Sequence, residues 1–518
     1  MNQLKRILCF LLAAMMLFAL AACGGGDTTD PSEDKEALAE AARNTVAITI
    51  GDHKLNAVEV NYYYIETINN FVGQYGSYLT YFMDVNSPLN QQKCAFDESM
   101  TWADYFMGVA QDNMKSTYML CDMAADAGYT LPEAERAYLG QMKSAIEQYA
   151  AYYKYESANA YLVDVFGYGA DMDSYLAYYE RAILADSYYT YYAENLNYDD
   201  AALREYESKE PHLYNSYTYA TYYLDCSKFL TGGSENSDGS TTYTDEQKQA
   251  AINAATEAVN VLLGSTCADM DAFKALILSM DINSGLDSVS PKEYTNQFFN
   301  STEKMFQDWF LEETRSVGQI AVIPKLSSVD DGEVIQGYYI LWYAEENDNR
   351  FALKDVRHML VLFKDANGKT YSDGIKTFTD AQKTTAKEGA EALLAQWLAG
   401  EANEDTFATL ASLKSEDEGS KAKGGLYTEI YPGQMVTNFE NWCYDETRAH
   451  GDYGLVETEY GYHVMFFVGN TDINYRDYVI SNTMRSEDIK KWHDDLLAAA
   501  VLTEVNLEYC ELDMVLSG

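Results

Sequence analysis

Positive charge is scarce in this chain, which has 36 lysine and arginine residues against 81 aspartate and glutamate residues and a formal net charge of −45. Nucleic acids and anionic lipid surfaces are negatively charged themselves and would be repelled by so acidic a protein. The acidic residues are dispersed and do not form one block, which is typical of solvated surfaces. We therefore expect no nucleic-acid partner.

Cysteine and histidine are also scarce, and their spacing fits none of the common metal sites. The chain has eight cysteines and six histidines, without a CxxC pair or a histidine at zinc-ligand spacing. Beyond the first 23 residues the cysteines stand far apart, at Cys94, Cys121, Cys226, Cys267, Cys443 and Cys510. We expect no metal and no cofactor, and most of these cysteines should be buried as small apolar side chains. Their pairing stays open, because connectivity does not follow from spacing.

Long apolar runs are missing except at the N-terminus. There, two basic residues precede an apolar run from Ile7 to Leu20, which at about fourteen residues is too short for a typical membrane-spanning helix. The run ends in LAAC, whose cysteine is Cys23, and a Gly/Asp-rich segment follows. This pattern predicts a lipoprotein signal peptide over 1–22, lipidation of Cys23 and an acidic flexible linker over 23–44. We thus expect a lipid-anchored protein on the extracytoplasmic face of a bacterial cell membrane.

Two stretches of the chain are near-copies of each other. "IQGYYILWY" begins at Ile335 and "EYGYHVMFF" begins at Glu459. Upstream of both, further blocks match at a nearly constant offset, including "MFQDWFLEETRSVGQ" with "NFENWCYDETRAHGD" and a Thr-Asp helix start before an Ala-rich amphipathic segment. We interpret 213–346 and 351–470 as a tandem duplication of one strand–helix–helix–strand unit.

The two copies differ at their first and last strands. The second copy has His358 in its first strand and His463 in its last, where the first copy has Thr221 and Tyr339. Because both histidines are present in one copy and absent from the other, we predict that the two positions lie close together in space.

The second copy resembles the parvulin-type peptidyl-prolyl isomerases. The likeness rests on ordered motifs: "VRHMLV", "SEDEG" before "GGL", "PGQM" followed by a phenylalanine, and "GYH". The whole order of segments resembles extracytoplasmic foldases of the PrsA and SurA kind. The resemblance implies isomerisation of X–Pro bonds, which cross a barrier of about 20 kcal/mol and exchange spontaneously in tens of seconds or longer.

The resemblance also implies which residues carry the reaction. His358 and His463 would lie side by side at the floor of a pocket, with Asp417 and Thr458 completing a hydrogen-bond network. The loop after the first strand has no arginine cluster of the kind that binds phosphate, so specificity for phosphorylated residues is not expected.

The proline ring of a substrate would lie against three apolar residues, Leu426, Met435 and Phe439. One wall of this pocket is left open by the sequence. An extra residue after Gly-Gly-Leu, compared with the family pattern, allows either Ile430 or Tyr431 to form the aromatic wall.

These features predict an α+β protein whose two terminal strands, 45–50 and about 501–511, pair in one small sheet. The predicted domains are a signal peptide (1–22), an acidic flexible linker (23–44), a helical chaperone-like domain (45–212), a degenerate parvulin-like module (213–346), a parvulin-type isomerase module (351–470) and a C-terminal helix and strand that pack on the N-terminal domain (471–518).

Three functions are compatible with the sequence. The first is a membrane-anchored foldase that isomerises X–Pro bonds in unfolded or partly folded exported proteins. The second is a holdase or secretion chaperone whose parvulin module is weak or inactive. The third, a solute-binding lipoprotein, is disfavoured by the duplication, because it would need two lobes of alternating strands and helices.

Two features leave alternatives open. The first copy lacks both histidines and would be either a structural scaffold or a peptide-binding domain. Many of the 45 tyrosines are crowded between Tyr62 and Tyr223. They either pack the faces of helices or line a concave surface for unfolded chains, since a tyrosine ring combines apolar area with a polar group.

Overall fold

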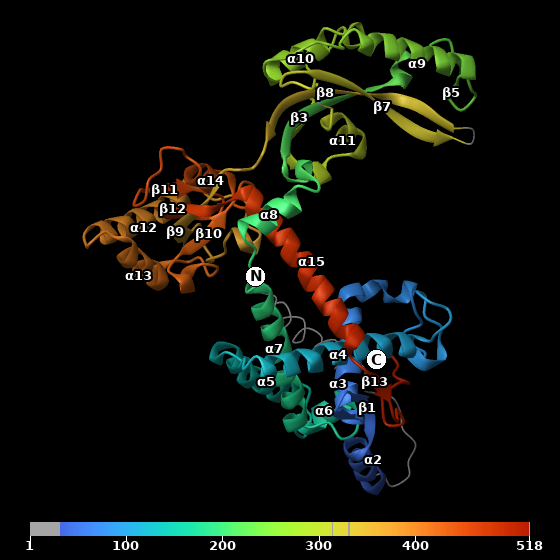
Figure 1. Cartoon of the computed structure of the whole chain (residues 1–518), viewed down its shortest axis with the longest axis vertical. Coiled ribbons are helices and arrows are strands. Elements are labelled where there is room, and N and C mark those ends of the chain that lie inside the picture. The colour runs from blue at the N-terminus through green and yellow to red at the C-terminus, as the bar shows by residue number, and fades with distance from the viewer. Residues whose placement is uncertain (1–31, 313, 330–331, 517–518) are drawn as a thin grey trace. The chain divides into compact units, whose positions relative to one another are not determined.

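A computed structural model describes residues 32–312, 314–329 and 332–516 of the chain (Figure 1). The predicted signal peptide (1–22) and the predicted lipidation site Cys23 lie outside the described residues. The chain forms two compact units, the second of which comprises 198–484, while the first combines residues up to 197 with those from 485 onward. Both helices and sheets are present, as the predicted α+β class requires.

The first unit is mainly helical with one small sheet. Its helices are α2 (Ser32–Asn44), α3 (Ala57–Tyr75), α4 (Trp102–Asp126), α5 (Glu133–Tyr152), α6 (Ala158–Phe166), α7 (Met172–Glu194) and the second half of α15 (Tyr475–Ala499), and its strands are β1 (Val46–Ile50), β2 (His53–Asn56) and β13 (Leu502–Glu504). Thr101 and Asp171 begin α4 and α7 with reciprocal capping boxes, which satisfy backbone N–H groups of the first turn.

The sheet of the first unit joins the two ends of the described chain. Strand β1 pairs antiparallel with β13, with Ile48 opposite Glu504, and β1 also pairs with β2 (Figure 1). The predicted pairing of the terminal strands is therefore present. The C-terminal strand is shorter than predicted, because the residues after Glu504 leave the sheet, and Cys510 packs into the helical core.

One prediction for the N-terminal segment was wrong. Residues 32–44, assigned to the flexible linker, form helix α2. Their sequence, SEDKEALAEAARN, is rich in strong helix formers. The helix is held in place because Ala39 and Ala42 are buried and the Arg43 guanidinium donates a hydrogen bond to the carbonyl oxygen of Gly169.

Tyrosines form much of the core of the first unit. Tyr62, Tyr64, Tyr161 and Tyr175 are among the largest fully buried side chains. The Tyr62 ring packs edge-on against the rings of Phe166 and Tyr175, with both centroids 5.2 Å away. For these tyrosines, packing between helices is the role that the structure supports.

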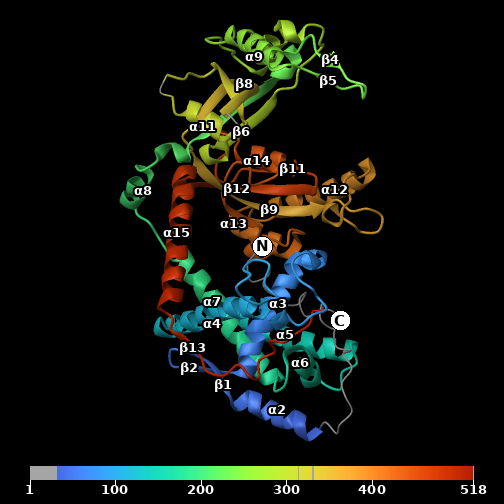
Figure 2. The same cartoon turned by 90° about the vertical axis from the view of Figure 1, so that its right-hand side faces the viewer.

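The second unit contains two four-stranded antiparallel sheets with the same strand order. The first sheet runs β6 (Lys292–Phe298), β3 (Ser216–Asp225), β8 (Gly332–Asn347) and β7 (Ile320–Val329), and the second runs β10 (Leu426–Ile430), β9 (Ala352–Leu362), β12 (Gly461–Asn474) and β11 (Tyr453–Glu457). In each sheet the first and last long strands of the copy lie side by side at the centre, as Figure 2 shows for β9 and β12. This is the arrangement that a duplication predicts.

The helices of the second unit cover both faces of each sheet. They are α9 (Asp245–Asn260), α10 (Met270–Leu278), α11 (Lys304–Phe310), α12 (Asp380–Leu398), α13 (Glu404–Lys414) and α14 (Thr437–Cys443). A two-stranded hairpin, β4 (Ser234–Glu235) with β5 (Thr241–Thr242), precedes α9. Helix α8 (Asp200–Glu207) packs outside the sheets, where Leu203 shares a small core with Tyr214 and Ile480. In the second copy α12 and α13 share one core with the sheet, while α14 shares a separate core with the opposite face. The face beneath α14 carries the site described below.

A buried ion-pair cluster connects segments that flank the two copies. The Glu207 carboxylate at the end of α8 accepts hydrogen bonds from Arg350, which lies between the copies, and from Arg476 in the first turn of α15. Residues 198–212 and 471–484, which the sequence assigned to the helical domain and the C-terminal segment, are thus part of the second unit.

Candidate active site

Two histidines from neighbouring strands meet on the face of the second sheet beneath α14. His358 of β9 lies opposite Met465 of β12, and His463 lies opposite Leu360. Side chains two residues apart along a strand share a face, so the histidines are diagonal neighbours within reach of each other. Their Nδ1 atoms are 2.9 Å apart, and only 2% of His358 and 5% of His463 is exposed.

The histidine pair continues at both ends into a hydrogen-bonded chain. Nε2 of His358 is 3.0 Å from a carboxylate oxygen of Asp417, and Nε2 of His463 is 2.9 Å from the hydroxyl oxygen of Thr458. The structure thus brings together the four residues predicted to be catalytic.

The chemistry of Asp417 decides which atom donates and which accepts at each hydrogen bond of this series. An ionised carboxylate can only accept, so Nε2–H of His358 donates to it. In a neutral His358 the Nδ1 atom then accepts from Nδ1–H of His463, whose Nε2 accepts the hydroxyl proton of Thr458. Every ring nitrogen has a partner in this arrangement, and the Thr458 hydroxyl is fixed in orientation.

Electrostatics favours this charge distribution. Burial, together with the neighbouring His358, lowers the pKa of His463 to about 3, so this ring is neutral near pH 7. Burial alone would raise the pKa of Asp417, but hydrogen bonds from His358, Ser420 and Tyr427 hold it well below its usual range. The carboxylate therefore stays ionised.

Two residues of this network were missed from the sequence. The Ser420 hydroxyl donates to Asp417, and the Tyr427 hydroxyl donates to the same carboxylate oxygen over 3.0 Å. The Tyr427 ring also stacks on His358, with the centroids 5.2 Å apart. The sequence signal for Tyr427 is its position directly after the Gly-Gly-Leu motif, one residue beyond the predicted Leu426.

The predicted proline-binding residues are only partly brought together. The ring of Phe439, on α14, packs edge-on against both imidazoles, each 5.3 Å away, and half-buried Met435 packs in the same core. Leu426 is not brought to the histidines, because it pairs with Arg357 and its side chain points to the face opposite Tyr427.

Neither Ile430 nor Tyr431, the two candidates for the aromatic wall of the proline pocket, lies against the histidine pair. Ile430 is fully buried in the core beneath α14. Tyr431 turns to Tyr475 at the start of α15, where the two rings stack with centroids 5.2 Å apart. Tyr427 stacks on His358, and Phe439 packs edge-on against both histidines.

Gly425 allows the loop carrying Asp417 and Ser420 to approach β9. Its φ angle is +74°, and a Cβ atom there would lie 2.1 Å from the carbonyl oxygen of His358. The backbone N–H of His358 donates to the carbonyl oxygen of Gly425 over 2.9 Å. Only glycine fits this conformation and this contact.

The first copy has the same framework with different chemistry. Thr221 lies opposite Leu341, and Tyr339 lies opposite Tyr223, which are the register positions of His358 and His463. The ring of Phe306, on α11, packs edge-on against Tyr339 at 5.3 Å, as Phe439 does against His463. Without imidazoles, the described residues of this copy (213–312, 314–329 and 332–346) hold no counterpart of the hydrogen-bonded chain.

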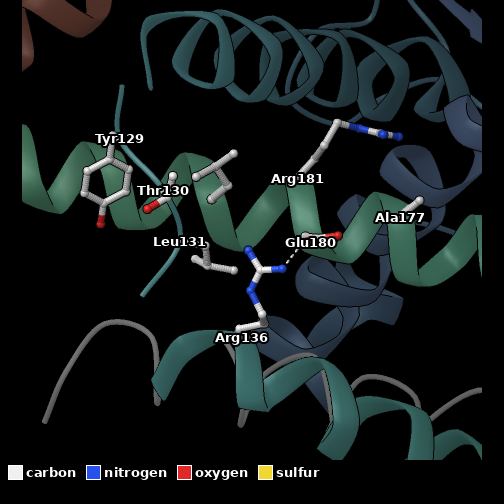
Figure 3. A pocket seen from close by; sticks show the side chains of 8 residues that line it. Tyr129, Thr130, Leu131, Arg136, Ala177, Glu180 and Arg181 are labelled. Carbon is white, nitrogen blue, oxygen red and sulfur yellow. Dashed lines mark ion pairs between the residues drawn. The ribbon is translucent and has the colours of Figure 1, made fainter. Parts of the chain in front are cut away.

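A separate pocket of about 340 Å³ lies in the first unit between α7 and the residues from Tyr129 to Arg136 (Figure 3). The Arg136 guanidinium and the Glu180 carboxylate form an ion pair across it, 3.6 Å apart. Tyr129 is the one tyrosine among the lining residues. This pocket is therefore not the tyrosine-lined surface that the sequence suggested as an alternative.

Across the residues that the structure describes, no helix combines the length and the apolar character needed to cross a membrane.

Comparisons with known proteins place the second copy in a family. Residues 358–468 match the family described as Rotamase, PPIC-type PPIASE domain. Foldase protein PrsA 3 of Bacillus anthracis is 34% identical over 92 residues, which are 18% of this chain and 32% of that protein. Foldase protein PrsA 3 of Bacillus cereus is 32% identical over 118 residues, 21% of this chain and 41% of that protein. A crystal structure of PrsA from Bacillus anthracis shares 24% identity over 29% of this chain and 59% of that chain, with a TM-score of 0.18.

The chain thus spans 32% and 41% of the lengths of these two curated relatives. The family match covers the two histidines, Asp417, Thr458 and Phe439. Residues 358–468 are therefore a parvulin domain, a peptidyl-prolyl isomerase module of the PPIC type that is homologous to part of the PrsA foldases.

Proposed function

We propose that this chain is an extracytoplasmic foldase whose second copy catalyses cis–trans isomerisation of X–Pro bonds in exported polypeptides. The observation that carries the proposal is the buried chain from Asp417 through His358 and His463 to Thr458, set against the Phe439 ring. Such a site suits a reaction in which no bond to the substrate is broken.

The reaction needs a surface that favours the twisted imide over both planar forms. In the twisted state the carbonyl group loses resonance with the proline nitrogen, so fixed polar groups and an apolar clamp for the ring lower the barrier. Phe439 and Met435 would hold the proline ring. The relay fixes the Thr458 hydroxyl before the substrate arrives, so little reorganisation is needed at the top of the barrier.

The proposal also includes attachment of the chain to the membrane and the class of polypeptides on which it acts. Lipidation of Cys23 would hold the chain at the outer face of the cell membrane, where exported proteins emerge unfolded. The likeness to PrsA foldases supports unfolded or partly folded polypeptides as substrates. The first copy would act as a scaffold, because its equivalent positions hold Thr221 and Tyr339.

The test compares catalysis with holding in the full chain. Wild type should accelerate the proline-limited refolding of a model protein at substoichiometric concentration. The double variant His358→Ala/His463→Ala should lose that acceleration but still suppress aggregation of an unfolded client. If wild type gives no acceleration, the isomerase assignment fails and a holdase with an inactive parvulin module takes its place. If the double variant accelerates refolding as much as wild type does, the assignment of the site to the two histidines fails.

A further inference from the structure

Residues 505–516, called the strap below, follow β13 and lie against the helical core of the first unit without forming a helix or a strand (Figure 1). Cys510 is buried in this core. Five further apolar side chains of the strap pack partly buried against the same core, namely Leu507, Tyr509, Leu512, Met514 and Leu516. The strap therefore covers apolar surface that would otherwise face solvent.

The strap is held largely through its main-chain atoms. The fully buried Asn61 of α3 accepts the backbone N–H of Glu511 at 3.0 Å and donates to the carbonyl oxygen of Tyr509 at 3.5 Å. The backbone N–H of Leu89 donates to the carbonyl oxygen of Met514 over 3.0 Å. Main-chain hydrogen bonds are open to any extended polypeptide, so this surface does not require the sequence of the strap.

The fit between the strap and this surface is incomplete. Tyr64 lies one helical turn after Asn61, so both side chains are on the same side of α3. The Tyr64 hydroxyl is buried within electrostatic range of Cys510 and Asp513, yet it has no hydrogen-bond partner among the described residues. A buried polar group without a partner is unfavourable, so a bound segment that offers this hydroxyl an acceptor would fit better than the strap does.

Charge also destabilises the strap in its position. Glu511 is half-buried, and its burial, together with the neighbouring Asp513, raises the pKa of its carboxyl group. The ionised carboxylate is thus disfavoured where it lies, whereas a neutral residue there would not be. The net charge of −45 on the whole chain adds a preference for neutral or basic segments over acidic ones.

We propose that the surface beneath the strap is a second binding site, which takes extended apolar segments of unfolded polypeptides with a neutral or basic residue at the place of Glu511. The strap covers this surface until such a segment displaces it. The site is separate from the histidine pair. It rests on the proposed function for its partner class, because it assigns a place where the unfolded polypeptides bind.

The test measures binding of a fluorescent peptide by anisotropy in the full chain. The peptide has the sequence of 505–516 with Cys510→Ala and Glu511→Gln. In the chain, Leu512→Asp puts a charge against the core and loosens the strap, while Val515→Asp adds the same charge at an exposed position. Apparent affinity follows the fraction of uncovered surface, so Leu512→Asp should bind the peptide about ten-fold more tightly than wild type. Val515→Asp should bind it as wild type does.

A second pair of variants changes the strap in the opposite direction and leaves its shape nearly unchanged. Glu511→Gln in the chain removes the disfavoured charge and should hold the strap more firmly, so the peptide should bind about three-fold more weakly than to wild type. Glu508→Gln makes the same change at an exposed position of the strap and should leave the affinity unchanged. This pair decides the matter even if Leu512→Asp fails to fold.

A reduced and carboxymethylated, permanently unfolded protein should displace the peptide from the Leu512→Asp chain. Unchanged affinity in both Leu512→Asp and Glu511→Gln would overturn the assignment. So would a peptide that the unfolded protein fails to displace, because the surface would then accept only the strap, its own or that of a second copy. Catalysed exchange of an Ala-Phe-Pro-Ala peptide should be equal in all these chains. Wild type that binds the fluorescent peptide as expected but catalyses no exchange would contradict the isomerase function alone.

Discussion

Replacing Thr458 with valine tests whether the relay positions the active site. The two side chains have nearly the same shape, so the substitution removes a hydroxyl without opening a cavity. The hydroxyl donates to Nε2 of His463 over 2.9 Å and accepts the backbone N–H of Tyr460 over 3.2 Å. Both partners lose a bond in a site where Thr458 is 5% exposed. An unpaired buried polar group costs about 1–3 kcal/mol, so the loss of both bonds should lower the free energy of unfolding by about 2–6 kcal/mol.

The loss of catalytic rate in Thr458→Val should be larger than the loss that follows from a smaller folded fraction alone. Without its donor, Nε2 of His463 no longer fixes the ring tautomer, and kcat/KM for X–Pro isomerisation should fall at least about ten-fold, or about 1.4 kcal/mol of barrier. Peptide exchange NMR gives the rate, and nitrogen-15 shifts of the imidazoles give the tautomers under conditions where the variant is folded.

The nitrogen-15 measurement has a clear reference. Wild type should show His358 protonated at Nε2 and His463 at Nδ1, and Thr458→Ser, which keeps the hydroxyl, should retain this pattern and most of the activity. A Thr458→Val chain with wild-type tautomers and wild-type rate would refute the positioning role of the relay.

Three further predictions concern pH and the backbone. Because burial lowers the pKa of His463 to about 3, this residue should contribute a loss of stability of the second unit between about pH 6.5 and 3, where the unfolded state binds more protons. The loss in the free energy of unfolding from His463 should be at most about 5 kcal/mol, and denaturant titrations at a series of pH values measure it. Burial raises the pKa of Glu66 to about 7, so the folded first unit binds more protons than the unfolded one and loses stability as pH rises from about 4.5 through 7. Hydrogen-exchange protection of α3 should report this loss of stability, and Glu66→Gln should flatten its dependence on pH. Gly425→Ala should lower both stability and activity, since the added Cβ would lie 2.1 Å from the carbonyl oxygen of His358, whereas Gly368→Ala in an open turn should leave activity unchanged.

The duplication and the histidine pair could be predicted because they rest on short-range patterns. Repeated blocks at constant offset fix equivalent strands, and strand alternation then fixes which side chains share a face. The pattern therefore predicts that His358 and His463 lie close together, and the 2.9 Å separation of their Nδ1 atoms bears that out. The pairing of the terminal strands was predicted on a different ground, because the C-terminal strand has no local partner, and β1 does pair with β13.

The errors occurred where register or burial decides the outcome. Leu426 and Tyr427 are adjacent, and a one-residue difference in strand register exchanges the faces they point to. The acidic composition of residues 32–44 predicts a linker, but the burial of Ala39 and Ala42 depends on contacts with the rest of the first unit that no local pattern shows. The domain limits near 198–212 depend on hydrogen bonds to the Glu207 carboxylate from Arg350 and Arg476, which are far away in sequence.

The central claim is that only the copy with two imidazoles isomerises X–Pro bonds, and one comparison in the full chain tests it most directly. His463→Tyr gives the second copy the residue that the first copy has at the equivalent position, while Tyr339→Phe changes the first copy by a single hydroxyl. The measurement is the exchange rate between cis and trans forms of an Ala-Phe-Pro-Ala peptide with each chain. The account predicts that His463→Tyr reduces catalysed exchange at least about ten-fold and that Tyr339→Phe leaves it at the wild-type rate. Undiminished exchange with His463→Tyr would contradict the claim.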